Sequence, residues 1–485
     1  MSLFLISLAI LIVGYIIYGK LTEKIFGIDP NRPTPAITKR DDVDYTPMSS
    51  WRVFLIQFLN IAGLGPIFGA IMGVMFGPAA FLWIVFGTIF AGAVHDYLSA
   101  MVCVRAGGIS LPEIVGHELG NGIKQVMRGF SIVLLILVGV VFVITPADII
   151  SGITPEWMDK NFWILIIFIY YILATLLPID KLIGNFYPIF GCALLFMAIG
   201  LMGVMIFGDV TIPATLTEGL QNRYPADQAA SHPIFPMMFV SIACGAISGF
   251  HATQSPMMAR CITNEKLGRP IFFGAMVAEG IVALIWAAAA ITFTGGYEGL
   301  ASYMSEHSAG QLVRDVSFNW LGTIGGLLAV LGVVVAPITT GDTALRSARL
   351  IAADFLKLNQ KKISRRLIIS VPLFIIAYIV MQHDFNILWR YFAWSNQTLA
   401  VFTLWAVTVY LARKRKFWLI SIVPALFMTT VSVSYLMIAP SPEGFGLSHT
   451  LAYSCGIATA AILLLLFLIY RKRLLSNDCK KEFDY

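Results

Sequence analysis

The chain has 485 residues, of which 58% are hydrophobic and only 12% are charged, and its mean hydropathy is +0.81. So much apolar surface does not fit inside a water-soluble core, which excludes a soluble enzyme and, despite the net charge of +6, a soluble nucleic-acid-binding protein. We therefore expect an all-α polytopic membrane protein whose solvent is the lipid bilayer, with no nucleic acid as a partner.

Apolar segments of ~17–25 residues, long enough to span the ~30 Å hydrocarbon core of a bilayer, recur along almost the whole sequence. The first lacks the basic start and small-residue cleavage site of a secretory signal, so we expect it to remain as an uncleaved helix. Thirteen transmembrane helices are predicted, at residues 2–18, 52–75, 78–104, 126–147, 162–178, 184–208, 234–257, 271–294, 319–340, 366–382, 386–411, 416–438 and 450–470.

Basic residues are distributed unevenly between the connections of these helices. Segments that follow odd-numbered helices hold 29 of the 33 Lys and Arg residues. Because cytoplasmic loops of membrane proteins are enriched in Lys and Arg, this asymmetry predicts an external N-terminus and a cytoplasmic C-terminus.

Two predicted helices are interrupted near their middles, by Ile61–Pro66 in the second and by Gly245–His251 in the seventh. Non-helical backbone at membrane depth is tolerated where protein or a water-filled cavity surrounds it, and matched breaks in two halves point to a transporter's binding site. The second helix begins on the cytoplasmic side and the seventh outside. This predicts inverted five-helix repeats at 52–208 and 209–411, with a first helix and loop at 1–51 and two additional helices and a basic tail at 412–485.

The breaks also supply candidate substrate ligands. Free N–H groups at the start of a half-helix attract anions, and free carbonyls at the end of a half-helix attract cations. Neutral amides on the same helices, and an aromatic cluster with amides in the eleventh helix, offer further contacts; close helix packing through glycine is the structural alternative. The predicted substrate-binding residues are Asn60, Gly63, Gly65, Pro66, Ser248, Gly249, His251, Gln254, Trp394, Asn396 and Gln397, with Gln57 nearby.

Ionisable side chains within membrane spans are costly and are therefore candidates for function. His95, Asp96 and Glu279 fall within predicted spans, and His251 lies at the second break. Histidine titrates near neutrality and a buried carboxylate can be shifted toward it, so these residues are candidates to carry a transported proton. The alternative for each is a structural hydrogen bond or ion pair.

A different coupling ion is indicated near the predicted end of the ninth helix. Ala336, Thr339 and Thr340 place a carbonyl and two hydroxyls on one helical face, close to Asp342. Oxygen ligands of this kind suit a sodium ion, whereas a helix C-terminal cap would explain the same threonines. The six cysteines form no C-x-x-C pair, so neither a metal site nor a cofactor is expected.

Several motifs occur in the order found in a known transporter family. They are Asp42–Pro47, Ile61–Pro66, Ala91–Tyr97, Ile242–Ala252, the set Thr339, Asp342, Arg346 and Arg349, and the set Trp389, Asn396 and Gln397. In these motifs the chain resembles the short form of the carbon starvation protein A family. The resemblance implies a five-plus-five inverted fold of the amino acid/polyamine/organocation type, residence in the bacterial inner membrane, and import of peptides or pyruvate, in some members with protons.

Two departures from the family pattern affect the expected chemistry. Many relatives carry a Gly-His-His run where this chain has Leu55-Ile56-Gln57, and the residues after His251 differ from the family's serine-rich pattern. Any metal or proton step that depends on the histidine pair is therefore in doubt here, and substrate choice can differ.

Other function classes lack their motifs. The sequence contains no H-E-x-x-H, no Walker-type phosphate loop and no selectivity-filter motif, which argues against an intramembrane metalloprotease, a primary pump and a channel. The expected function is a secondary transporter of small carboxylate-bearing nutrients, coupled to protons. A sodium-coupled carrier of the same fold and a membrane nutrient sensor without net transport remain the alternatives.

Overall fold

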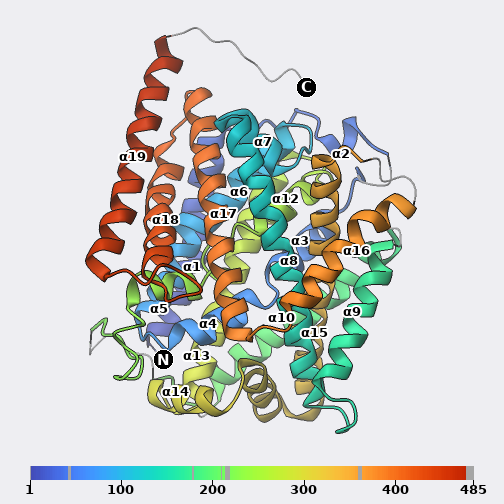
Figure 1. The fold of residues 1–485 in the computed structure, drawn as a ribbon, viewed down its shortest axis with the longest axis vertical. Coiled ribbons are helices and arrows are strands. Elements are labelled where there is room, and N and C mark those ends of the chain that lie inside the picture. The colour runs from blue at the N-terminus through green and yellow to red at the C-terminus, as the bar shows by residue number, and fades with distance from the viewer. Residues whose placement is uncertain are drawn as a thin grey trace.

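The computed structural model describes residues 2–41, 45–176, 180–208, 210–213, 219–358 and 363–476, and helices are the regular elements of these ranges. The motif residues Asp42, Val43 and Asp44 lie outside them. The helices form an elongated bundle, with the start of α1 (Ser2–Phe26) and the end of α19 (His449–Ser476) at opposite ends (Figure 1). We name these ends the α14 side and the α7 side, after α14 (Tyr297–Glu306) and α7 (Leu111–Leu119), which lie there.

The remaining elements follow the chain between these landmarks. They are α2 (Pro35–Thr38), α3 (Ser50–Ile61), α4 (Gly65–Val74), α5 (Ala79–Leu82), η1 (Trp83–Gly92), α6 (Ala93–Arg105), α8 (Asn121–Ser151), α9 (Lys160–Leu176), α10 (Asp180–Phe207), η2 (Ile234–Met238), α11 (Phe239–Ser241), α12 (His251–Ala259), η3 (Glu265–Leu267), η4 (Arg269–Phe273), α13 (Gly274–Phe293), α15 (Ala309–Phe355), α16 (Ile363–Val380), α17 (Phe385–Arg413) and α18 (Leu419–Ile438).

Eight helices of the described residues are long and apolar enough to cross a membrane, or up to nine if the bent pair α3–α4 is one span. The protein is thus an all-helical, multi-pass membrane protein. Each of the thirteen predicted segments overlaps helical structure, but α9, α16, α17 and the helices of 234–259 are not among those eight or nine. The count of thirteen spans stays a prediction.

Burial separates central helices from peripheral ones. The apolar windows of α8 and of the α13 region are 83% buried, whereas those of α1 and α19 are 28% and 22% buried. Large apolar side chains such as Ile17 and Ile457 are exposed on the peripheral helices, as expected where lipid is the neighbour. The candidate site lies among the central helices.

Both predicted breaks are present. Helix α3 ends at Ile61, and α4 resumes at Gly65 with a bend of 46°. The second interruption separates α11, which ends at Ser241, from α12, which starts at His251. Pro66 fits the first turn of α4 because the missing N–H of proline would be unpaired there in any case.

The predicted end of the ninth helix near residue 340 is wrong. Helix α15 continues to Phe355, so Thr339 and Thr340 lie inside it and do not form a C-terminal cap. The interruption in α15 is instead at Gly322, whose φ of 68° is a left-handed conformation that glycine adopts without steric cost.

Candidate functional site

The two breaks are in direct contact. A side chain on Gly65 would overlap Cys244, and a Cβ on Gly69 would lie 2.8 Å from the backbone oxygen of Ser241. On the other break, a Cβ on Gly245 would lie 3.5 Å from the Cα atom of Pro66. Glycine fits these positions because neighbouring atoms leave no room for a Cβ: the nearest are the Cys244 side chain at Gly65, the Ser241 backbone oxygen at Gly69 and the Ala283 side chain at Gly245. The structure therefore brings together the two segments that the sequence marks as interrupted.

Asn396 of α17 holds the second break in place. Its amide oxygen accepts hydrogen bonds from the Ser248 hydroxyl at 3.0 Å and the Phe250 N–H at 2.6 Å, and its amide nitrogen donates to the Cys244 sulfur at 3.0 Å. Its backbone oxygen accepts the N–H of Gly249 at 3.0 Å. These bonds satisfy backbone groups that the interruption leaves without helical partners. Asn396 and Ser248 thus have structural partners, and their role as substrate ligands stays a prediction.

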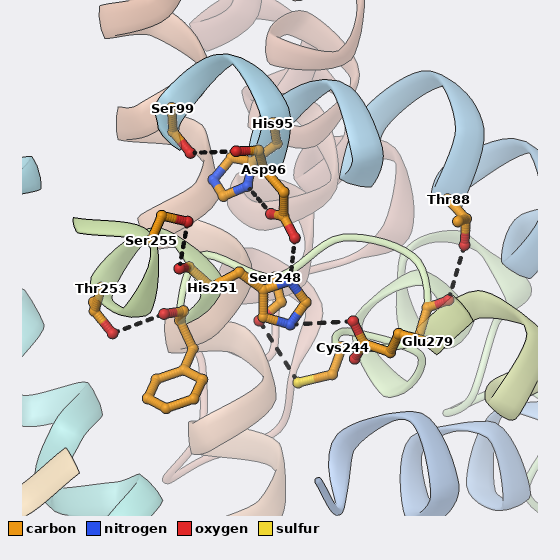
Figure 2. A network of polar contacts seen from close by, with 12 residues as sticks. Thr88, His95, Asp96, Ser99, Cys244, Ser248, His251, Thr253, Ser255 and Glu279 are labelled. Atoms are coloured by element: carbon orange, nitrogen blue, oxygen red, sulfur yellow. Dashed lines mark hydrogen bonds and ion pairs between the residues drawn. The ribbon is translucent and has the colours of Figure 1, made fainter. Parts of the chain in front are cut away.

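Four ionisable side chains meet beside this break, and each is fully buried (Figure 2). Asp96 of α6 receives the Nδ1 atoms of both histidines: His95 lies 2.7 Å from its Oδ1 atom and His251 lies 2.8 Å from its Oδ2 atom. The other ring nitrogen of His251, Nε2, lies 3.3 Å from Oε2 of Glu279 in α13. We call these four residues the His–carboxylate cluster. The sequence analysis named all four as candidates to carry a proton, with His251 also a predicted substrate ligand. The structure brings the four together, and their role stays a prediction.

The arrangement constrains the protons of the His–carboxylate cluster. Both Nδ1 atoms face one carboxylate, so each is assigned a proton that it donates to Asp96. Nε2 of His251 and Oε2 of Glu279 then need one proton between them, on either atom. Among the described residues, Nε2 of His95, Nε2 of His251 and both carboxylate oxygens of Glu279 have no hydrogen-bond partner, the 3.3 Å contact between His251 and Glu279 being an ion pair. A further proton can bind at Nε2 of His95 or on Glu279.

Three buried amides lie near the breaks: the predicted substrate ligands Asn60 and Gln254, and Gln57 beside them. Gln57 and Asn60 share one face of α3, and neither amide has a hydrogen-bond partner in the described part of the chain. The amide nitrogen of Gln254 in α12 donates to Thr253 at 3.3 Å, while its oxygen has no hydrogen-bond partner among the residues that the structure describes. Buried amides are normally satisfied, so these three keep hydrogen-bonding capacity that a polar solute can use.

Other predicted residues are engaged elsewhere. The indole N–H of Trp394 donates to the Ser432 carbonyl of α18 at 3.0 Å, and the amide of Gln397 donates to the carbonyl of Phe239. A Cβ on Gly63 would lie 3.7 Å from Phe142 of α8.

The predicted sodium ligands form bonds within their own helix. The hydroxyls of Thr339 and Thr340 donate to the Ala336 carbonyl at 2.8 and 2.9 Å. The Oδ1 atom of Asp342 lies 3.7 Å from a guanidinium nitrogen of Arg346, one turn further along the helix. Within the described ranges, no group of three or more His, Cys, Asp or Glu side chains is placed to hold a metal ion. Sodium binding here remains an untested prediction.

Two contacts at the second break were missed from sequence. The hydroxyl of Thr88 in η1 donates to the Gly245 carbonyl at 3.1 Å, and Cys244 contacts both Asn396 and Ser248. Thr88 is the one hydroxyl residue in the apolar run 83–92, which is the signal that sequence reasoning had available.

Comparison with known proteins identifies the family to which the chain belongs. A family model described as carbon starvation protein CstA matches residues 1–156, 147–319 and 294–435. An uncharacterized membrane protein of Haemophilus influenzae is 44% identical over 356 residues, covering 63% of this chain and 94% of that protein. A peptide transporter CstA of Bacillus subtilis is 25% identical and covers 91% of this chain and 92% of its own length. The pyruvate/proton symporter BtsT of Escherichia coli is 27% identical over 58% of this chain and 47% of its own length.

Among solved structures, the chain is similar to a manganese transporter of Eremococcus coleocola. The TM-score is 0.51 with 13% identity, over 88% of this chain and 94% of that one. The likeness establishes a shared fold of the LeuT-like class.

Proposed function

Because the chain belongs to the carbon starvation protein CstA family, we propose that it is a secondary active transporter that imports small carboxylate-bearing solutes, peptides or pyruvate, together with protons. Relatives are named as peptide transporters, and one as a pyruvate/proton symporter. The observation that carries the proposal is the His–carboxylate cluster, which lies at the second break with every member shielded from solvent.

The charge of this cluster explains how a proton would be coupled. With Asp96 ionised, His95 neutral and one proton shared between His251 and Glu279, the four groups carry a net charge of −1. A buried net charge is costly in a low-dielectric interior, and one added proton cancels it. Protonation on Nε2 of His95 or on Glu279 would therefore favour the state in which the site is closed to water.

The substrate site of the proposal lies where the two breaks touch. Carboxylate recognition would come from the positive dipole ends of the half-helices α4 and α12 and from the spare amide atoms of Gln57 and Asn60. Half-helix starts suit an anionic group without a fixed positive charge.

A five-plus-five inverted repeat is the finer fold that we propose. Each group opens with a broken helix, and in each the next helix contains a π-helical stretch, η1 in the first and η4 in the second. The two broken segments run in opposite directions: the chain leaves the α7 side in α3 and approaches it in α12 (Figure 1). The α7 side would face the cytoplasm, because Arg105 and Arg413 end α6 and α17 there and Lys124 lies in the first turn of α8.

Transport by purified protein in proteoliposomes tests this function. Labelled pyruvate and labelled dialanine are offered separately, with a proton gradient, a sodium gradient or neither. Accumulation that requires the proton gradient is the expected result. Substrate binding without flux would identify a sensor, and uptake driven only by sodium would overturn the assignment of the coupling ion.

A further inference from the structure

A separate cavity of about 300 Å³ opens on the α14 side. Phe68 and Met72 of α4 form its inner wall, and the exposed Glu306 and His307 line its mouth. The other walls come from α8, α9 and the starts of α15 and α17. Since α4 follows the first break, the cavity lies next to that break, on its α14 side.

Aromatic side chains separate this cavity from the breaks. Phe68 lies 5.9 Å from Trp389 between ring centroids, Trp389 lies 5.4 Å from Phe392, and Phe392 lies 5.9 Å from Phe142, the neighbour of Gly63. Trp389 is 2% exposed, so this aromatic layer is packed. A solute in the cavity would therefore occupy a site distinct from the His–carboxylate cluster.

Thr145 of α8 lines the cavity with a hydroxyl that has no hydrogen-bond partner in the described residues, although the residue is 98% buried. Such a hydroxyl is exceptional among the threonines that the structure describes. Of the ten buried threonines in the described ranges, the other nine donate to a backbone carbonyl. Because a helical threonine usually bonds the carbonyl one turn back, its free hydroxyl indicates a polar partner in the cavity.

Two opposite charges lie beside this hydroxyl. Asp148, one turn along α8, accepts the Ser308 hydroxyl at 2.6 Å, and its second oxygen lies 3.4 Å from the ammonium of Lys160. That separation exceeds the roughly 2.7–2.9 Å of a tight charge-assisted bond, so the pair can open to accept further partners. A ligand with both charges would complete it, with its ammonium on Asp148 and its carboxylate on Lys160. A monocarboxylate would satisfy only Lys160 and would face the carboxylates of Asp148 and Glu306.

We propose that this cavity is an outer binding site for a small zwitterion, an amino acid or peptide with a free ammonium and a free carboxylate, held by Thr145, Asp148 and Lys160 before it passes the aromatic layer. The inference rests on the proposed transport function, since it assigns an entry site to the same solute path. It adds a substrate class, because it favours zwitterions over monocarboxylates.

Uptake kinetics of labelled dialanine and labelled pyruvate in proteoliposomes test the site. Asp148→Asn should raise the KM for dialanine about tenfold and Thr145→Val about threefold, with Vmax changed less than twofold and pyruvate kinetics unaltered. Asp148→Glu should restore most of the affinity. Glu156→Gln removes an exposed carboxylate from the neighbouring loop and should have no effect. An unchanged KM for dialanine in both cavity variants would overturn the inference.

Equilibrium binding of labelled dialanine to detergent-purified protein separates this inference from the transport proposal. Saturable binding that weakens in Asp148→Asn supports the site even if no variant transports. Proton-driven uptake with no change of binding or KM in the cavity variants overturns the site alone. Displacement of dialanine by pyruvate as readily as by another dipeptide would overturn the preference for zwitterions, and absence of both binding and uptake of dialanine in the wild type would overturn it as well.

Discussion

His251, the first residue of α12, bonds Asp96 of α6 through its Nδ1 atom at 2.8 Å, although 155 positions separate the two in sequence. This bond joins the second broken helix to a central helix of the first half of the chain. A change of protonation at His251 therefore acts on the residue at which α12 begins. The relationship links proton binding to the geometry of the break.

The Asp96→Asn variant should lose proton-driven accumulation. The neutral amide can accept from only one histidine well, and its NH₂ group opposes the other Nδ1–H, so the paired arrangement of His95 and His251 breaks. We expect accumulation under a pH gradient to fall at least tenfold. Asp227→Asn changes an exposed carboxylate and serves as the control. If Asp96→Asn accumulates substrate like the wild type under the same gradient, the proton binds elsewhere.

The Glu279→Gln variant should behave differently, because glutamine is a neutral substitute for the protonated acid. Its amide N–H can face Nε2 of a neutral His251, which keeps the contact between the two side chains while removing the titration. Substrate exchange across the membrane without a gradient should persist, and uptake should become independent of pH between about 5.5 and 8. Exchange and net uptake are measured in the same vesicles, so that loss of proton coupling is distinguished from loss of transport. Retention of the wild-type pH profile would exclude Glu279 from coupling.

Much of this site was predictable from sequence, because the costs that mark it are local. Breaks such as Ile61–Pro66 and charged residues such as Glu279 within apolar runs are recognisable without knowing what they touch. The partners of these residues could not be predicted from the sequence, since the His251–Asp96 bond depends on how helices far apart in the chain pack together. The misplaced end near Thr340 has a physical reason too: the polar, charged stretch after Gly341 reads as a loop, but it continues α15 and is largely buried.

Gly249→Ala should abolish uptake and lower stability. A Cβ there would overlap backbone atoms of Asn396 and Ala400 and lie 2.6 Å from the Cβ of Leu399, and backbone cannot rotate away as a side chain can. We expect at least a tenfold loss of uptake together with a lower melting temperature. Gly203→Ala in α10 is the matched control, because nothing lies within 4 Å of its new methyl group. Normal uptake by Gly249→Ala would show that α17 does not need to pack this closely.

Gly65→Ala should also abolish uptake, but here the obstructing atoms belong to a side chain, so a second substitution can restore activity. Its methyl group would overlap the Cβ and Sγ atoms of Cys244, so Cys244→Gly removes the obstructing atoms. The single Gly65→Ala variant should be inactive, and the double variant should recover part of the uptake, a non-additive result expected for residues in contact. If the double variant reaches the membrane and is as inactive as the single, the loss does not come from this contact.

The Thr339→Ala/Thr340→Ala double variant decides between protons and sodium. Both hydroxyls donate to the Ala336 carbonyl inside α15, so their removal should cost about 0.5–1.5 kcal/mol of stability per bond, partly offset by the better helix propensity of alanine. Thr403→Ala, which removes an equivalent bond to Leu399 in α17, should cost a similar amount. Uptake at fixed pH should be the same in sodium and in choline for the wild type and for the double variant. Sodium stimulation in the wild type that disappears in the double variant but persists in Thr403→Ala would instead identify these hydroxyls as ligands of a coupled cation, because a dehydrated sodium ion tolerates little loss of oxygen ligands.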